Sequence, residues 1–180
     1  GPVAIDTVIG HNSTTLVTLI NAGTTALSFV VIAVDSCNNP SAPSSPHSTI
    51  FLNAGFDICT QSADLAWTPY GFWGTQPSYE IFVSINGGPE TLIGSTMQTS
   101  FSDTNLVSGG NFCYRVRAVE NGGVRSSTSN RICITPNYPP PPSFSYLRNV
   151  TVISTDVVNI IAYVDPAPTV TGYQLLRSSS

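Results

Sequence analysis

The sequence contains no lysine, and its six basic residues are all arginine. Charged residues make up only 9% of the 180 residues, the formal net charge is −4, and the pI is about 4.8. Nucleic-acid binding needs a basic patch or stripe, so no nucleic acid is expected as a partner. The low charge does not indicate disorder, because 41% of the residues are hydrophobic.

Long apolar runs and targeting signals are also missing. No run reaches the roughly 18 residues that a membrane-spanning helix needs. No basic segment followed by an apolar stretch and a cleavage site opens the sequence. We therefore expect no membrane span, and the sequence gives no signal from which to read an export route.

Residues that carry enzyme chemistry are few and scattered. The two histidines, His11 and His47, fall in expected loops and supply no triad by their spacing. No Gly-x-Ser-x-Gly elbow, no paired carboxylates and no Cys/His cluster occur. We expect no enzymatic activity, no catalytic residue, no cofactor and no metal site.

Four cysteines stand at positions 37, 59, 113 and 133, within a sequence rich in Ser, Thr, Asn and Gly. This composition favours an oxidising, extracellular setting. Cys113 and Cys133 lie on adjacent expected strands, nearly equidistant from a Gly122-Gly123 turn, so they can bond. Cys37 and Cys59 then pair with each other or stay reduced. A Cys59–Cys113 bond is a rival, and the sequence does not decide between these connectivities.

Short β-rich runs alternate with turn signals at the spacing typical of an all-β sandwich, and helical periodicity is nowhere sustained. An Asn86-Gly87 turn and an Asn121-Gly122-Gly123 turn join two pairs of these runs. The expected strands are Ala63–Trp67, Tyr79–Ile85, Thr91–Gly94, Thr99–Ser102, Phe112–Val119 and Asn130–Thr135.

The sequence also repeats itself. Residues 27–35 align with residues 112–120, which lie 85 positions later, and residues 171–178 align with 78–84. Gly1-Pro2 likewise aligns with Gly88-Pro89. We expect residues 1–53 to be the last strands of one sandwich, 54–137 a complete sandwich, and 138–180 the first strands of a third. A proline run at 139–142 is the expected linker.

The two outer fragments together match one complete domain. Each alone would expose an apolar sheet face and open strand edges, which is costly. We therefore expect the fragments to complete each other head to tail, either along one long polypeptide or between separate copies. The alternative is that the fragments are partial domains with frayed ends.

Modification and recognition candidates are few. Asn12 and Asn149 begin N-glycosylation patterns, and Thr7 lies in an Asp-Thr-Val pattern of bacterial O-glycosylation. The aromatic residues of the loop after Trp67 could stack on sugar rings, or they could cover a junction between domains. The candidates for stacking are Tyr70, Phe72 and Trp73.

The middle of the chain resembles a fibronectin type III domain. The resemblance rests on Trp67, on Tyr79, on Leu106 ahead of Ser108-Gly109-Gly110, on the 114–118 run and on the Ser-x-x-Ser-Asn pattern at 126–130. It implies tandem immunoglobulin-like sandwiches, one complete and two partial and complementary. Two positions depart from the pattern. Phe112 replaces the usual corner tyrosine, and Ala162 stands where the third domain would carry its core tryptophan.

A narrower resemblance comes from residues 5–8, 33–39, 47–50, 65–70 and 79–81. These stretches are similar to the repeat regions of large surface proteins of gliding Bacteroidota, which the type IX secretion system exports. The resemblance implies a structural repeat of an extracellular fibre, filament or adhesin, with copies of itself or adjacent repeats as partners. The alternative is a carbohydrate-binding or spacer module of a secreted enzyme, with surface glycans as partners.

Overall fold

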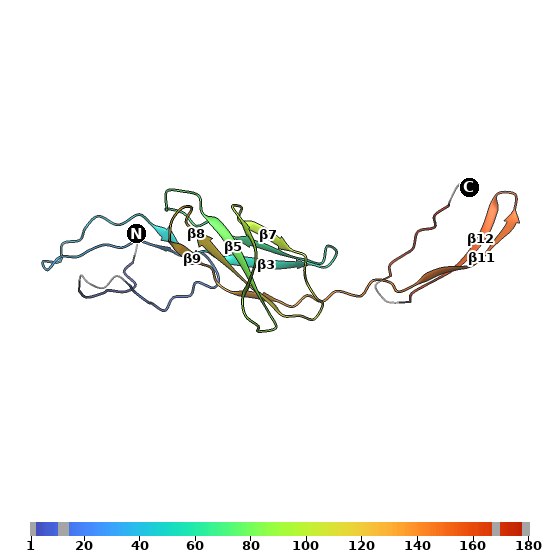
Figure 1. The fold of residues 1–180 in the computed structure, drawn as a ribbon, viewed down its shortest axis with the longest axis horizontal. Helices are drawn as coiled ribbons and strands as arrows, with labels where there is room; N and C mark the ends of the chain where they lie inside the picture. Colours follow the sequence, from blue (N-terminus) through green and yellow to red (C-terminus); the bar gives the residue numbers. More distant parts are fainter. Residues whose placement is uncertain (1–2, 11–14, 167–169, 178–180) are drawn as a thin grey trace. The chain divides into compact units, whose positions relative to one another are not determined.

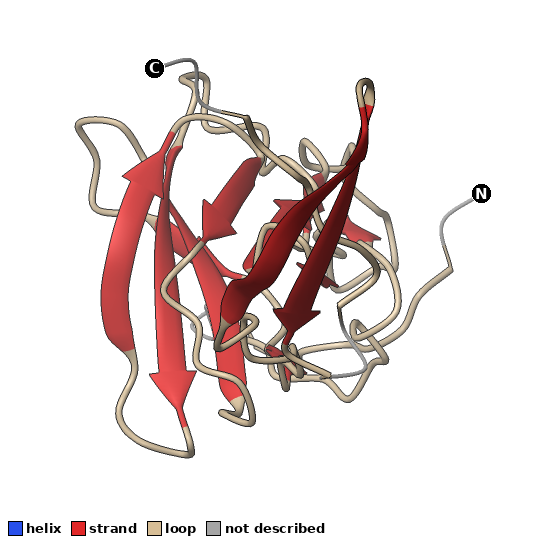
Figure 2. Cartoon of the chain, turned by 90° about the vertical axis from the view of Figure 1, so that its right-hand side faces the viewer, coloured by secondary structure: helices blue, strands red, loops and turns tan. Residues whose placement is uncertain are grey.

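The computed structural model describes residues 3–10, 15–166 and 170–177. Figure 1 shows the course of the chain, and Figure 2 shows only strands and loops among the described residues. The expected all-β class is therefore confirmed. The chain divides into two compact units, residues 1–136 and 137–180, which are described separately.

Unit 1 is built around a two-sheet sandwich over residues 50–136, called the middle sandwich below. One sheet has the strand order β3-β4-β7, and the other has the order β10-β8-β5-β6 with β9 also paired to β8; all pairs are antiparallel. The strands are β3 (Leu52–Asp57), β4 (Ser62–Trp67), β5 (Ser78–Ile85), β6 (Thr91–Thr96), β7 (Ser100–Asp103), β8 (Phe112–Val119), β9 (Ser126–Thr128) and β10 (Ile132–Ile134).

Alternation along each strand puts one apolar face of each sheet into a shared core. In β8 the inward residues are Phe112, Tyr114, Val116 and Ala118, and each is at most 1% exposed. The opposite sheet and β5 contribute the same kind of residue. The remaining core members are Ile50, Leu52, Ala63, Leu65, Trp67, Tyr79, Ile81, Val83 and Leu106.

Every strand expected between residues 63 and 135 is present, with its ends displaced by no more than two residues. Two further strands, β3 and β9, were not predicted. β3 crosses the expected domain boundary at residue 53, and Ile50 and Leu52 already belong to the core. The Asn86-Gly87 turn is confirmed, with φ values of 51° and 76° that suit the positive-φ requirement of a type I′ hairpin turn.

Two side-chain contacts tie distant parts of the middle sandwich together. The buried Tyr114 hydroxyl donates to Asp103 Oδ2 at 2.9 Å, and the Asn105 N–H donates to Asp103 Oδ1 at 3.0 Å. Asn130, between β9 and β10, bridges to the first residue of β3. The Leu52 N–H donates to Asn130 Oδ1 at 2.6 Å, and Asn130 Nδ2 donates to the Leu52 carbonyl at 3.0 Å.

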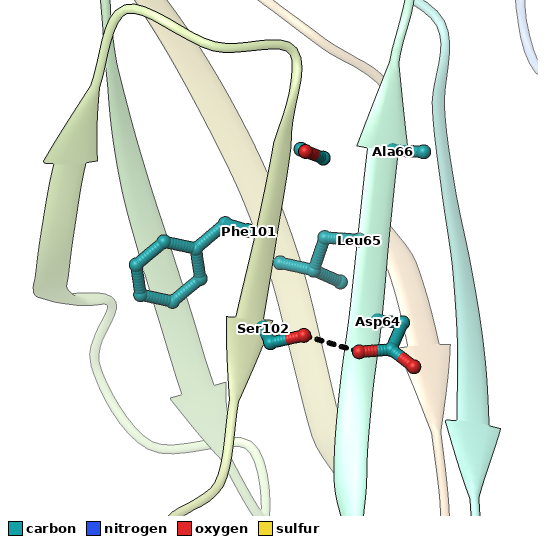
Figure 3. A pocket seen from close by; sticks show the side chains of 6 residues that line it. Asp64, Leu65, Ala66, Phe101 and Ser102 are labelled. Carbon is teal, nitrogen blue, oxygen red and sulfur yellow. Dashed lines mark hydrogen bonds between the residues drawn. The ribbon is translucent and has the colours of Figure 1, made fainter.

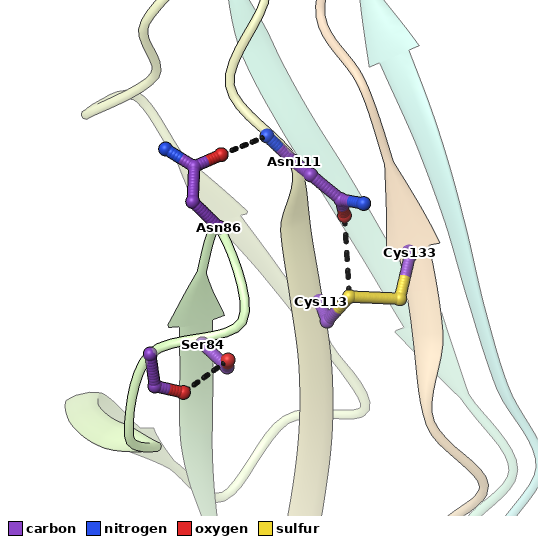
Figure 4. The surroundings of a disulfide bond; sticks show 6 residues. Ser84, Asn86, Asn111, Cys113 and Cys133 are labelled. Carbon is purple, nitrogen blue, oxygen red and sulfur yellow. Dashed lines mark hydrogen bonds between the residues drawn. A yellow bond between two sulfur atoms is a disulfide. The ribbon is translucent and has the colours of Figure 1, made fainter.

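A Cys113–Cys133 disulfide joins β8 to β10, where the two cysteines stand directly opposite each other (Figure 4). Beside it, the Asn111 N–H donates to Asn86 Oδ1 at 2.9 Å, so the ends of β5 and β8 are also linked. Of the pairings that the sequence left open, the structure contains Cys113–Cys133, while Cys37 and Cys59 are free and exposed.

Before the middle sandwich, unit 1 contains one further hairpin over residues 27–49. Its ladder includes β1 (Ser28–Phe29) and β2 (His47–Ser48), and the Thr49 N–H donates to the Leu27 carbonyl at 2.8 Å. A bridge between Val34 and Pro40 closes the ladder near its tip. We call this element the β1–β2 hairpin.

Unit 2 contains a single long hairpin, β11 (Ser145–Ser154) with β12 (Val157–Val164). The strand expected over residues 171–177 is not formed, and Tyr173, Leu175 and Leu176 are 71%, 57% and 85% exposed. In the middle sandwich the corresponding strand, β5, is held between β6 and β8. The part of unit 2 that the structure describes offers no such neighbours.

Replacing Tyr114 with Phe should destabilise the middle sandwich. The change leaves a buried Asp103 carboxylate oxygen without its donor, which costs about 1–3 kcal/mol. Urea unfolding of the variant and of the wild type measures the difference. Tyr146→Phe is the matched control, because Tyr146 is exposed in unit 2; an equal effect of both changes would contradict the assignment.

The Tyr114–Asp103 pair should also make the free energy of unfolding depend on pH. Burial, the hydrogen bond to Asp103 and the Asp103 charge raise the pKa of Tyr114 above the usual tyrosine value of 10.0. In the folded chain the Tyr114 hydroxyl therefore keeps its proton at pH values where it loses that proton in the unfolded chain. The stabilisation from its bond to Asp103 is present below pH 10 and declines as the pH rises above 10. The stability difference between wild type and Tyr114→Phe should narrow above pH 10.

Removing the disulfide should also destabilise the middle sandwich. The bond closes a loop with a sequence separation of 20 residues, for which the chain-entropy estimate is about 3 kcal/mol. The Cys113→Ser, Cys133→Ser double variant should unfold at a correspondingly lower urea concentration. Cys37→Ser removes an exposed free thiol and should change stability by less than about 0.5 kcal/mol.

Candidate interaction surfaces

The β1–β2 hairpin repeats several hydrogen bonds of the β8 hairpin. In the middle sandwich the Val116 N–H donates to Ser129 Oγ at 3.0 Å and the Ser129 N–H donates to the Val116 carbonyl at 2.8 Å. Eighty-five residues earlier, Val31 and Ser44 make the same two bonds at 3.0 and 2.9 Å. Ser129 and Ser44 each also donate a hydroxyl to the carbonyl of the next residue. The sequence repeat is therefore a structural repeat as well.

The two hairpins differ in what covers them. Val116 is completely buried under the opposite sheet, whereas its counterpart Val31 is 73% exposed. On the same face of this strand, Phe29 is half-buried and Ala33 is exposed. The β1–β2 hairpin therefore has the local structure of a sandwich strand pair, and the described residues form no second sheet over its core face.

The β11–β12 hairpin can be compared with β3–β4 by the sequence match that places Ala162 at the position of Trp67. The inward pairs of β3–β4 are Leu52 with Trp67, Ala54 with Leu65 and Phe56 with Ala63. Their counterparts are Leu147 with Ala162, Val150 with Ile160 and Val152 with Val158. A β-bulge at Arg148 keeps these residues on one face despite the extra residue in β11.

The inward face of β3–β4 is buried, whereas the matching face of β11–β12 is exposed along β11 and half-buried at Ile160 and Ala162 of β12. Leu52 and Leu65 are 0% and 2% exposed, whereas Leu147, Val150 and Val152 are 54%, 56% and 72% exposed. None of the six counterpart residues is charged. A contiguous exposed apolar face is typical of an interaction surface.

A separate cluster of aromatic side chains lies in the loop after β4. The Tyr70 hydroxyl is 3.0 Å from His47 Nδ1, and the Tyr70 and Trp73 ring centroids are 4.4 Å apart. The Arg125 guanidinium lies 5.9 Å from the Trp73 ring centroid. Tyr70 and Trp73 are partly buried against the core, and Trp67 is a core residue, as predicted.

Phe72 is placed differently from the other two stacking candidates. It is 58% exposed and has a φ of 73°, a strained conformation for a bulky residue, while its ring lies 6.0 Å from that of His47. The structure thus packs Tyr70 against Trp73, and the Tyr70 hydroxyl bonds to His47 of the β1–β2 hairpin. Phe72 faces solvent. The contact with His47 shows that the loop covers the chain segment that leads into β3.

A shallow depression on the surface between β4 and β7 is lined by Asp64, Leu65, Ala66, Ser100, Phe101 and Ser102 (Figure 3). The Ser102 hydroxyl donates to Asp64 Oδ1, and the Ser62 hydroxyl donates to the same oxygen at 3.4 Å. Asp64 therefore serves as a contact between neighbouring strands.

The two free cysteines occupy similar turns at the two ends of one extended run of chain. The Cys37 N–H donates to Asp35 and the Cys59 N–H donates to Asp57, at 2.8 and 2.7 Å. Hydrogen bonds, chiefly from the Asn39 side chain and the Thr60 backbone respectively, hold the pKa of Asp35 and that of Asp57 below the usual value. Both thiols are free and exposed, so Cys37 and Cys59 do not pair with each other in this structure.

The modification candidates are exposed where they are described. Thr7 is exposed, with its N–H donating to Asp6, and Asn149 is exposed on the face of β11 opposite the apolar one. Asn12 and His11 lie outside the described residues. Glycosylation at any of these positions stays a prediction.

No model of a known protein family matches the chain, and no curated protein matches it. Within the described ranges, no helix is long and apolar enough to cross a membrane. No group of three or more His, Cys, Asp or Glu side chains gathers as a metal site in that part of the chain.

Because Trp73 packs against the core, Trp73→Ala should lower the free energy of unfolding by about 2 kcal/mol. The exposed Phe72 offers the matched control, and Phe72→Ala should change it by less than about 0.5 kcal/mol. Urea unfolding measures both effects. Glycan-array binding by the wild type that is lost in Trp73→Ala would contradict a purely covering role and favour sugar stacking.

Proposed function

We propose that the chain is a non-enzymatic structural repeat of an extracellular surface fibre, filament or adhesin. It propagates head to tail when neighbouring copies complete a split sandwich. One observation carries the proposal. The β1–β2 hairpin repeats β8 and its partner strand, the β11–β12 hairpin repeats β3–β4, and both have their core faces uncovered. In the middle sandwich these two types of hairpin belong to the two facing sheets.

The strand arrangement supports a fibronectin type III assignment for the middle sandwich. Three strands face a sheet in which β5 and β8 are central, and the resemblance motifs around Trp67, Tyr79 and Leu106 supply core residues. On this assignment the β1–β2 hairpin ends one such domain, and the β11–β12 hairpin begins another.

The middle sandwich favours an open arrangement of copies. Leu52, the first residue of β3, bonds to Asn130 just before β10, and β3 and β10 continue in contact. Both strands therefore start at the same end of the sandwich and run toward the other end. The chain enters the middle sandwich at one end and leaves it at the opposite end, which suits head-to-tail continuation rather than closure within one chain.

The Cys113–Cys133 disulfide supports placement in a non-reducing environment. Together with the resemblance to Bacteroidota surface repeats, it favours a role outside the cell, with export by the type IX system and an association with gliding motility. The mass of the intact native chain distinguishes a long multidomain polypeptide from separate subunits.

Self-association of the 180-residue chain tests the proposal. Sedimentation velocity should show concentration-dependent association, and electron microscopy should show rods or filaments. Compact monomers at every concentration, with no rods or filaments in native material, would refute the proposal.

A charge placed on the uncovered face should abolish this association. Val152 is 72% exposed, so Val152→Asp should change the free energy of unfolding of the chain by less than about 0.5 kcal/mol. In a completed sandwich the same carboxylate would be buried without a partner, which costs several kcal/mol. Thr151→Asp, on the opposite face of β11, is the matched control and should still associate in sedimentation velocity.

A further inference from the structure

The middle sandwich is held by four specific contacts, and each is missing at the equivalent positions of the two open hairpins. The equivalence is fixed by the shared bonds of Val31 with Val116 and Ser44 with Ser129. For β11–β12 it follows from the sequence match of Ala162 to Trp67, which the register of each hairpin extends to the paired residues. The comparison can therefore be made residue by residue.

The first missing contact is the disulfide. Counterparts of Cys113 and Cys133 lie 85 residues earlier, at Ser28 and Ser48. These two serines stand directly opposite each other in the β1–β2 ladder, as the two cysteines do in the β8–β10 ladder. The position is thus preserved while the covalent bond is absent.

The second missing contact is the bridge between sheets. Asn130 uses its amide to accept from the Leu52 N–H and to donate to the Leu52 carbonyl. Ser45 is its counterpart, since the preceding serines 44 and 129 both bond to the carbonyl of the following residue. Leu147 is the counterpart of Leu52. Serine is one bond shorter and has no amide to span the gap.

The last two missing contacts lie in the core. Phe29 is the counterpart of Tyr114, so the hydroxyl that bonds to Asp103 is absent. Ala162 is the counterpart of Trp67, which packs edge-on against Tyr79 with ring centroids 5.4 Å apart. A sandwich made from the two open hairpins would therefore lack the largest side chain of its β3–β4-type sheet.

We infer that the β11–β12 apolar face receives the β1–β2 hairpin of a second copy in the register of the middle sandwich. Because the four contacts are missing, this shared sandwich is the weak, exchangeable link between permanently folded middle sandwiches. The inference rests on the proposed function and adds the register and the reversibility of the junction to it. Apolar burial alone provides the attraction, so each restored contact should tighten it.

Restoring the missing contacts tests the inference in the full chain. Ser45→Asn should bridge to the partner's Leu147 backbone and lower the dissociation constant about tenfold, the change that corresponds to two modest hydrogen bonds. A disulfide between Ser28→Cys and Ser48→Cys should hold the β1–β2 hairpin in its bound conformation. It should lower the dissociation constant further, because less conformational entropy is lost on binding.

The cysteine pair is made in a Cys37→Ser, Cys59→Ser background, which removes the exposed thiols. Oxidised glutathione supplies the oxidant, taking two electrons and two protons from the two thiols as it is reduced to two molecules of glutathione. Ser45→Ala and Ser28→Cys alone are the matched controls and should leave the dissociation constant within about twofold of the wild type. Urea unfolding of the middle sandwich should be the same in all variants, which shows that they fold.

The possible results distinguish failure of the proposed function from failure of the proposed register. Complete absence of association in every variant would overturn the proposed function. Association of the wild type that Ser45→Asn and the cysteine pair leave unchanged would overturn the proposed register and keep the proposed function. Wild-type assemblies that separate only at the urea concentration that unfolds the middle sandwich would overturn the exchangeable link. Dissociation at lower urea, with tightening by both restored contacts, supports the inference.

Discussion

The whole structure depends on one constraint, which is that the apolar face of a sheet must be covered by a second apolar face. The middle sandwich satisfies it, because β3–β4–β7 and the sheet around β5 and β8 bury their inward side chains against each other. The two outer hairpins have similar alternation, and the β1–β2 hairpin shares hydrogen bonds with its counterpart, but among the described residues no second sheet buries either one. The chain therefore contains one buried sandwich and two hairpins with exposed apolar residues, and its proposed role follows from this difference.

Much of this arrangement could be predicted from the sequence, because it depends on local patterns. Alternation in Phe112–Val119 and the Asn86-Gly87 turn correctly located strands and a turn. The match of residues 27–35 to 112–120 located the β1–β2 hairpin. β3 was missed because Asn53, Gly55 and Asp57 interrupt its apolar residues and are unfavourable in strands, whereas tertiary pairing with β4 decides its conformation.

The contacts that hold the middle sandwich together could not be read from local patterns. The Leu52–Asn130 bridge joins residues 78 positions apart, and Asp103 meets Tyr114 only because the two sheets face each other. The alternating sequence pattern also predicted one strand that the structure does not contain. Residues 171–177 alternate like β5, yet without the equivalents of β6 and β8 they make no strand among the described residues. Strand patterns predict what a segment can do when partners exist.

The aromatic loop shows the same dependence on context. From the sequence, Tyr70, Phe72 and Trp73 looked like one set, but the fold divides them. Tyr70 is hydrogen-bonded to His47 and packs with Trp73 against the core, whereas Phe72 remains exposed.

In the proposed fibre the two uncovered faces are different surfaces, so their contact is heterologous and continues from copy to copy rather than closing on itself. Such a fibre needs a permanent element and an exchangeable one, and the four contacts present in the middle sandwich and absent from the open halves provide that distinction.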